Sequence, residues 1–169
     1  MTSFSLRSLK LRSGETYRDE REVELEPLVL GGERYLPVPG KVAADFTVFR
    51  ASTGTMFELR FQARLHGPCY RCMKDAVVDE SISAREYQAT SPGTSEELST
   101  PYIADDMLDL SAWARDAVVL ALPDKILCRV DCAGLCAVCG LDLDAEPHDH
   151  GPLDVDPRWG ALAELKDRL

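Results

Sequence analysis

The chain has 169 residues, of which 45% are hydrophobic and 28% are charged, a composition typical of one globular domain and not of a disordered, fibrous or membrane protein. Its 29 acidic and 19 basic residues give a net charge of -10, which opposes long-range attraction to nucleic acid and better suits a basic protein partner. The N-terminal stretch lacks the apolar run of a secretory signal, so we expect a cytoplasmic protein. The longest apolar stretch, residues 117–122, is too short to cross a bilayer, so we expect no membrane segment.

Alternating apolar and polar residues predict β-strands in the first half of the chain. The pattern is clearest where Phe57, Leu59 and Phe61 alternate with charged or polar residues. A shorter alternation before Pro27 indicates an edge strand, because proline interrupts the hydrogen bonds of a central strand. The predicted strands are residues 22–25, 42–49, 56–65 and 76–87. They are compatible with a small antiparallel sheet or with a partly open β-barrel.

The pattern becomes helical after a polar segment. Residues 90–101 are rich in Ser, Thr and Pro, which is typical of a mobile loop. From Asp109, a residue type that caps helices, apolar residues recur on one predicted helical face until Pro123 ends the run. This face is predicted to consist of Leu110, Trp113, Ala117 and Leu120 and to lie on the sheet.

A second amphipathic helix is predicted near the end of the sequence. Asp156 and Pro157 are typical of the start of a helix, and apolar residues follow at near-helical spacing: Trp159, Leu162, Leu165 and Leu169. The predicted fold is therefore one α+β domain over residues 1–169, with two or so helices and a Cys/His-rich loop near residues 128–150.

Metal-ligating residue types are concentrated in that loop, which contains Cys128, Cys132, Cys136, Cys139, His148 and His150. Clustered cysteines in a chain without an export signal are more often metal ligands than disulfides. The segment from Cys136 to Gly140 has the Cys-x2-Cys-Gly spacing of a zinc knuckle, in which the glycine permits a tight turn below two thiolates. Cys69 and Cys72, at the end of the clearest strand, have the same spacing. Thiolate-rich sites favour zinc or iron–sulfur clusters, and no iron–sulfur spacing is present, so we expect a structural zinc ion.

These eight candidates are more than one tetrahedral ion requires. Because ligands close in sequence form a short loop at small entropic cost, we favour one zinc ion bound by the local set of Cys128, Cys132, Cys136 and Cys139. A mixed site with His148 or His150 is the second choice, and an eight-ligand arrangement for two zinc ions is the third. The alternative is that the cysteines are small buried hydrophobic residues and that the two histidines lie in a solvated turn.

Four basic residues are the best candidates for contact with RNA phosphates: Arg60, Arg64, Arg71 and Lys74. Arg60 and Arg64 would share one face of a strand. We favour the simpler interpretation that this is a solvated sheet face balanced by Glu58, since the net charge of -10 opposes RNA binding.

Four motifs follow one another along the chain: CYRC, DLSAWARDAVVLALP, the C-x3-C-x-GLC-x2-CG series and DPRW, which together cover about the last hundred residues. This ordered series resembles the YceD family, also called the large ribosomal RNA subunit accumulation protein family. The resemblance implies a non-enzymatic bacterial factor for accumulation of 23S ribosomal RNA. Its partner would be a large-subunit precursor, contacted through a basic ribosomal protein or 23S rRNA, and no small-molecule substrate is expected.

The chain departs from the zinc-type members of that family at two places. Ala137 stands where a proline is usual, and His148-Asp149-His150 stands where a Cys-x-Cys is usual. Imidazole and thiolate are both good zinc ligands, so metal binding is still expected. The alternative function is a zinc- or thiol-dependent enzyme that uses Cys69 and Cys72 as a redox pair or a zinc ion with an open position, but no accompanying catalytic constellation supports it.

Overall fold

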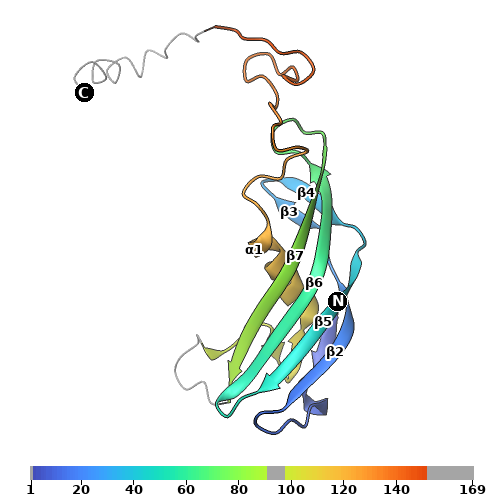
Figure 1. The fold of residues 1–169 in the computed structure, drawn as a ribbon, viewed down its shortest axis with the longest axis vertical. Helices are drawn as coiled ribbons and strands as arrows, with labels where there is room; N and C mark the ends of the chain where they lie inside the picture. The colour runs from blue at the N-terminus through green and yellow to red at the C-terminus, as the bar shows by residue number, and fades with distance from the viewer. Residues whose placement is uncertain (1, 91–97, 152–169) are drawn as a thin grey trace, which may run out of the picture.

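A long hairpin of β6 (Gly54–Pro68) and β7 (Asp75–Ala89) is the central feature of the computed structural model, which describes residues 2–90 and 98–151 (Figure 1). The two strands pair antiparallel from Gly54 and Ala89 at one end to Pro68 and Asp75 at the other. The second edge of β6 pairs with β5 (Lys41–Arg50) and, farther along, with β4 (Glu33–Pro37). β2 (Thr16–Glu24) and β3 (Leu28–Leu30) extend the sheet beyond β5 and β4, so the six described strands form an open sheet and not a closed barrel.

A second, three-stranded sheet joins the start of the chain to the start of the helix. It consists of β1 (Ser3–Ser5), β9 (Met107–Asp109) and β8 (Ile103–Ala104), in that order, and a short 3-10 helix, η1 (Leu6–Ser8), follows β1. β9 leads directly into α1 (Leu110–Ala121), whose first two N–H groups both donate to the Thr2 carbonyl, at 3.0 and 3.2 Å. The N-terminal segment thereby fixes the beginning of the helix.

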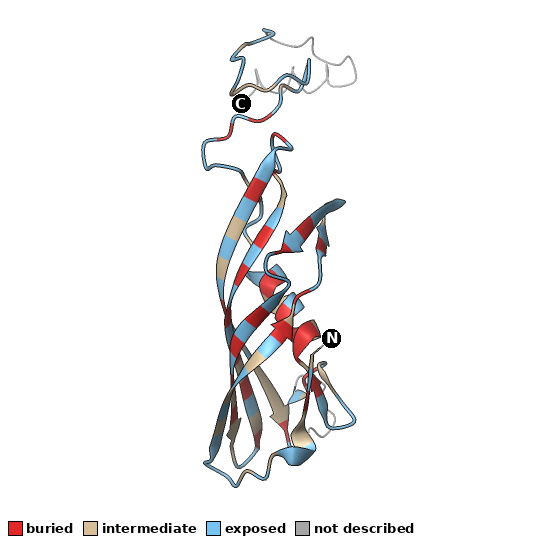
Figure 2. Ribbon diagram, turned by 90° about the vertical axis from the view of Figure 1, so that its right-hand side faces the viewer, coloured by how far each residue is buried: buried red, intermediate tan, exposed pale blue. Residues whose placement is uncertain are grey.

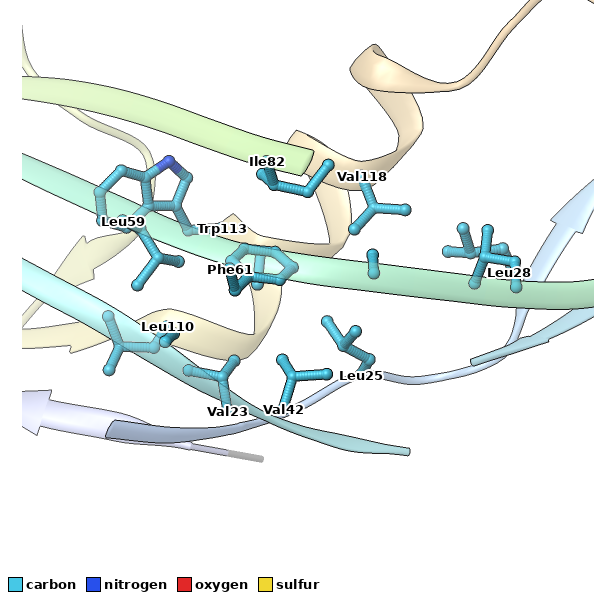
Figure 3. Packing of buried hydrophobic residues seen from close by; sticks show 14 of the residues in the cluster. Val23, Leu25, Leu28, Val42, Leu59, Phe61, Ile82, Leu110, Trp113 and Val118 are labelled. Carbon is cyan, nitrogen blue, oxygen red and sulfur yellow. The ribbon is translucent and has the colours of Figure 1, made fainter. Parts of the chain in front are cut away.

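The core lies between one face of the large sheet and α1. Buried and exposed residues alternate along the strands, so each strand turns one side to the helix and the other to solvent (Figure 2). Side chains from the sheet, such as Leu59 and Ile82, point into the same layer as Trp113 and Val118 of the helix (Figure 3). Trp113 is only 2% exposed, which makes it the main side chain that anchors the helix to the sheet.

The capping of α1 was predicted correctly, but one residue of its buried face was not. The Asp109 side chain accepts a hydrogen bond from the N–H of Ala112, at 3.0 Å, and the helix ends at Ala121, before Pro123. Leu120, predicted to face the core, is 86% exposed. With 3.6 residues per turn, the face that begins at Leu110 continues through buried Ala114 and Val118, and Leu120 lies beyond its edge.

The four predicted strands are confirmed, with β2 at the edge of the sheet as expected. The described residues contain a single α-helix, because the second predicted helix, from Asp156, lies outside them, as do residues 91–97 of the predicted mobile loop. None of the helices that the structure describes has the length and hydropathy needed to cross a membrane. The single-domain organisation over residues 1–169 stays a prediction.

Candidate metal centres

The structure brings the eight predicted ligands together as two separate groups of four. We call Cys69, Cys72, Cys128 and Cys132 the inner group, and Cys136, Cys139, His148 and His150 the outer group. Within each group the ligand atoms all lie within 4.8 Å of one another. Both groups lie at one end of the molecule, where the β6–β7 turn meets the loop that follows α1 (Figure 1).

The inner group has the geometry of a tetrahedral thiolate site. The Sγ atoms of Cys69 and Cys132 are 3.9 Å apart, and those of Cys72 and Cys128 are 3.7 Å apart. Four thiolates bound to one zinc ion at about 2.3 Å lie roughly 3.8 Å from one another, whereas a disulfide requires about 2.05 Å. All four cysteines are free, and only Cys128 is exposed. The inner group therefore fits a buried, four-coordinate zinc ion.

The two Cys-x2-Cys turns share one backbone conformation. The N–H of Cys69 donates to the Lys74 carbonyl at 2.7 Å, and the N–H of Met73 donates back to the Cys69 carbonyl at 3.0 Å. At the corresponding positions of the outer turn, Cys136 donates to Leu141 at 2.8 Å and Gly140 donates to Cys136 at 2.9 Å. Both turns therefore have the conformation of a zinc knuckle. The sequence predicted it only for the outer turn, because only that turn has a glycine after its second cysteine.

In each knuckle, the first cysteine lies where backbone N–H groups favour its ionised form. Burial disfavours the Cys69 thiolate, but the N–H groups of Cys128, Cys72 and Arg71 outweigh it and lower its pKa to about 6. The N–H groups of Cys139 and Val138 likewise lower the pKa of Cys136 to about 6. The thiolate is the form that binds metal, so these two cysteines are the readiest ligands, while burial raises the pKa of Cys132 to about 12.

The outer group is a mixed site at the exposed tip of the loop. The Sγ of Cys139 lies 3.1 Å from Nε2 of His148, and the rings of His148 and His150 meet edge to face with centroids 4.9 Å apart. Nδ1 of His148 lies 2.6 Å from the Glu146 carbonyl, so a proton on Nδ1 donates to it and leaves Nε2 available as a ligand. This second contact orients the imidazole as in known zinc sites, and two thiolates with two imidazoles fit zinc.

Contacts outside the two groups hold the β6–β7 turn against the loop. The Arg71 guanidinium donates to the Cys132 carbonyl at 2.6 Å, and the N–H of Leu135 donates to the Arg71 carbonyl at 3.1 Å. Gly134, at φ +84°, lies so close to Arg71 that an added Cβ would be 3.0 Å from the Arg71 Cβ. Lys74 forms an ion pair with Asp142, which joins the inner knuckle to the outer one.

A family model described as "Large ribosomal RNA subunit accumulation protein YceD" matches residues 57–166. This chain belongs to the YceD family. The match starts within β6 and includes β7, α1 and every residue of both candidate metal groups, whereas β1 to β5 precede it. The part that matches the family is therefore the hairpin, the helix and the Cys/His-rich loop.

The relatives of this YceD family member include mycobacterial proteins that are described as uncharacterized. One from Mycobacterium tuberculosis and one from Mycobacterium bovis are each 34% identical over 125 residues, which is 72% of this chain and 60% of the relative. One from Mycobacterium leprae is 37% identical over 103 residues, which is 57% of this chain and 46% of the relative. The chain thus spans at most about 60% of the length of these relatives. No solved structure matches it.

The local four-cysteine set that we favoured from the sequence is not the set that the structure of this YceD protein assembles. Cys128 and Cys132 join Cys69 and Cys72, while Cys136 and Cys139 lie with the histidines. The arrangement corresponds to our third choice, with eight ligands in two groups. The equal Cys-x2-Cys spacing of the pairs that begin at Cys69 and Cys136 is consistent with two sites. The entropic preference for ligands close in sequence led instead to the local set.

The four basic side chains that were candidates for phosphate contact all form hydrogen bonds or ion pairs within this YceD protein. Arg60 pairs with Glu58 at 2.8 Å, and Arg64 makes two hydrogen bonds to Asp79, at 2.6 and 3.1 Å. Arg71 and Lys74 hold the Cys/His-rich loop through the contacts described above. Arg60 and Arg64 do share the solvent-facing side of β6, but their charges are locally balanced.

Proposed function

We propose that this protein is a non-enzymatic, cytoplasmic accessory factor in assembly of the bacterial large ribosomal subunit, where it supports accumulation of 23S ribosomal RNA. The observation that carries this proposal is the family match over residues 57–166, since the family is named for accumulation of the large ribosomal RNA subunit.

We also propose that the protein binds two structural zinc ions, one in each group, and not the single ion expected from the sequence. The inner group would be bound by four thiolates, and the outer group by two thiolates and two imidazoles. Zinc would fasten the loop after α1 to the end of the β6–β7 hairpin, because the inner group takes two ligands from each segment.

A structural role is favoured over an enzymatic one by the number of donors. Each group offers four protein ligands, which is a complete tetrahedral shell, whereas catalytic zinc sites keep one position open for water or substrate. The alternative of a zinc- or thiol-dependent enzyme would require one ligand of a group to stay unbound.

The charge distribution favours a protein partner over naked RNA. The net charge is -10, and the basic residues Arg60, Arg64 and Lys74 are paired with carboxylates. A basic ribosomal protein within the large-subunit precursor is therefore the better-matched ligand.

The decisive experiment combines a gene deletion with an affinity purification. In the deletion strain, the ratio of 23S to 16S rRNA should fall and should recover when the wild-type gene is restored. The tagged protein should co-purify large-subunit precursors, and treatment with nuclease should leave a ribosomal protein attached. An unchanged rRNA ratio together with a preparation free of ribosomal components would contradict the proposed function.

A further inference from the structure

Among the residues that the structure describes, the outer edge of β7 is unpaired along the whole strand. β7 (Asp75–Ala89) pairs only with β6, and the register contains no bulge over its 15 residues. In an antiparallel edge strand, alternate residues direct their N–H and C=O groups away from the partner. Within residues 2–90 and 98–151, no other backbone group pairs with β7 from that side. Such an edge is a template for one more strand.

A groove runs along this edge, between β7 and α1. Its volume is about 410 Å³. Ile82 and Ala84 of β7 form one wall, and Trp113, Ala117 and Leu120 of α1 form the other. Leu120 is 86% exposed on this rim and Val119 beside it is 38% exposed, so the helix presents apolar surface that its own sheet does not cover.

The carboxylate that lines the groove is Glu86. Asp116, nearby, forms an ion pair with Arg115 at 2.9 Å and accepts a hydrogen bond from the hydroxyl of Tyr102, another lining residue, at 3.2 Å. Burial, together with Asp116 and Glu86, raises the pKa of Tyr102 to about 12. Arg85, the basic residue of the lining, donates to Glu58 on the opposite face of the sheet at 2.8 Å. A segment with Lys or Arg side chains is therefore complementary to this groove.

We propose that an extended, basic peptide segment of a partner protein binds in this groove as an additional antiparallel or parallel strand along β7. Backbone hydrogen bonds to the open edge would supply part of the affinity. Alternate apolar side chains would contact Leu120 and Ala117, while a basic side chain would approach Glu86. The inference rests on the groove itself, so it stands or falls independently of the ribosomal role.

A defined probe tests the proposal. A synthetic peptide in which Lys alternates with Val is titrated against the protein, and a peptide in which Glu alternates with Val serves as the control of equal apolar content. The Lys peptide should bind saturably, more weakly as salt is added, and the Glu peptide should not. Hydrogen exchange should slow at alternate amides between Ala76 and Gln88, because only outward N–H groups gain a partner.

Matched variants distinguish the groove from the rest of the surface. Leu120→Arg should weaken peptide binding about tenfold or more, since it removes apolar contact and adds repulsion. Val130→Arg is the control, because Val130 is 95% exposed on the metal-ligating loop and the same charge is introduced. Glu86→Lys should weaken binding about threefold, and Glu33→Lys on β4 should give only the small effect of the net charge.

Each contrary outcome would overturn the proposal. These outcomes are absence of binding by the Lys peptide, equal losses for Leu120→Arg and Val130→Arg, or peptide binding without protection of β7. A dimer in solution with β7 amides already protected would show that a second copy of the chain covers the groove. Slower exchange at β7 with an RNA oligonucleotide but not with the peptide would assign the groove to nucleic acid.

Discussion

Met73 occupies the position in the inner knuckle that Gly140 occupies in the outer one. Its φ is +60° and that of Gly140 is +75°, so both residues adopt the left-handed conformation that lets the turn close below the sulfur atoms. Glycine adopts this conformation without penalty, whereas a residue with a Cβ is destabilised by roughly 1–2 kcal/mol. The conformation of the inner knuckle is therefore maintained by its surroundings and not by the preference of Met73.

Met73→Gly is expected to raise the free energy of unfolding by up to about 1 kcal/mol. The reason is that the backbone strain relieved in the folded state exceeds the cost of the greater conformational entropy of glycine in the unfolded chain. Met73 is 50% exposed, so little packing is lost with its side chain. Thermal or urea unfolding measures the difference. Met107→Gly is the control, since Met107 is similarly exposed but lies in β9 without a positive φ, and this variant should be less stable than wild type. Equal losses in both variants would show that Met73 is not strained.

At the scale of elements, α1 has apolar side chains that the sheet covers and others that it leaves exposed. Trp113, 2% exposed, packs between the helix and the sheet, whereas Leu120, about 20° farther around the helix, is 86% exposed beside the groove along β7. The two residues lie seven positions apart on a helix of 12 residues. Substituting each of them therefore compares a buried with an exposed side chain on the same helix.

Trp113→Ala is expected to destabilise the protein by about 3–5 kcal/mol, as large-to-small substitutions in a packed core do. Leu120→Ala should change stability by less than about 0.5 kcal/mol, because little of its side chain is removed from water. Urea unfolding followed by circular dichroism checks both values. A large loss for Leu120→Ala would mean that it is covered in the folded protein.

The two candidate metal groups differ in how they are connected to the rest of the fold. Cys69, Cys72 and Cys132 belong to the same hydrophobic cluster as the sheet and helix. The outer group lies at the tip of the loop, where Cys139 and His150 are exposed. We expect the inner ion to contribute to the stability of the core and the outer ion to order only the tip.

Cys132→Ser is accordingly expected to lower the stability of the whole protein, by about 3 kcal/mol for a tightly bound ion that is lost. Cys139→Ser should leave the unfolding of the sheet nearly unchanged and increase hydrogen exchange only around residues 136–150. Thermal melts and exchange mass spectrometry make the comparison. Global unfolding of Cys139→Ser would show that the two groups form one cooperative unit.

At the scale of the whole molecule, the two groups of candidate ligands predict two bound ions. Elemental analysis of the freshly reduced protein should find about two zinc equivalents. A chelator should remove them in two phases, the exposed outer ion before the buried inner one, and the second loss should coincide with a drop in melting temperature. One equivalent that is released in a single phase would favour a single site.

Features governed by neighbouring residues could be derived from the sequence alone. The alternation in β6 identified its buried face, the Asp109 cap and Pro123 bounded α1, and the spacing of cysteines and histidines identified all eight candidate ligands. These depend on periodicity and on turn chemistry, which act over a few positions. The same periodicity predicted that Leu120 is buried, because it lies only about 20° around the helix from Trp113, but the edge of the region that the sheet covers falls between the two.

Only the tertiary structure decided how the ligands are grouped. Cys69 and Cys132 are 63 positions apart, and loop closure over that distance argued against their pairing. Packing of α1 on the sheet already brings the β6–β7 turn and the loop after the helix to the same end of the molecule, so the entropy of closure has been offset by the hydrophobic core. For the same reason, the open edge of β7 and the groove beside α1 could not be read from local patterns, since both depend on which strands remain unpaired in the complete sheet.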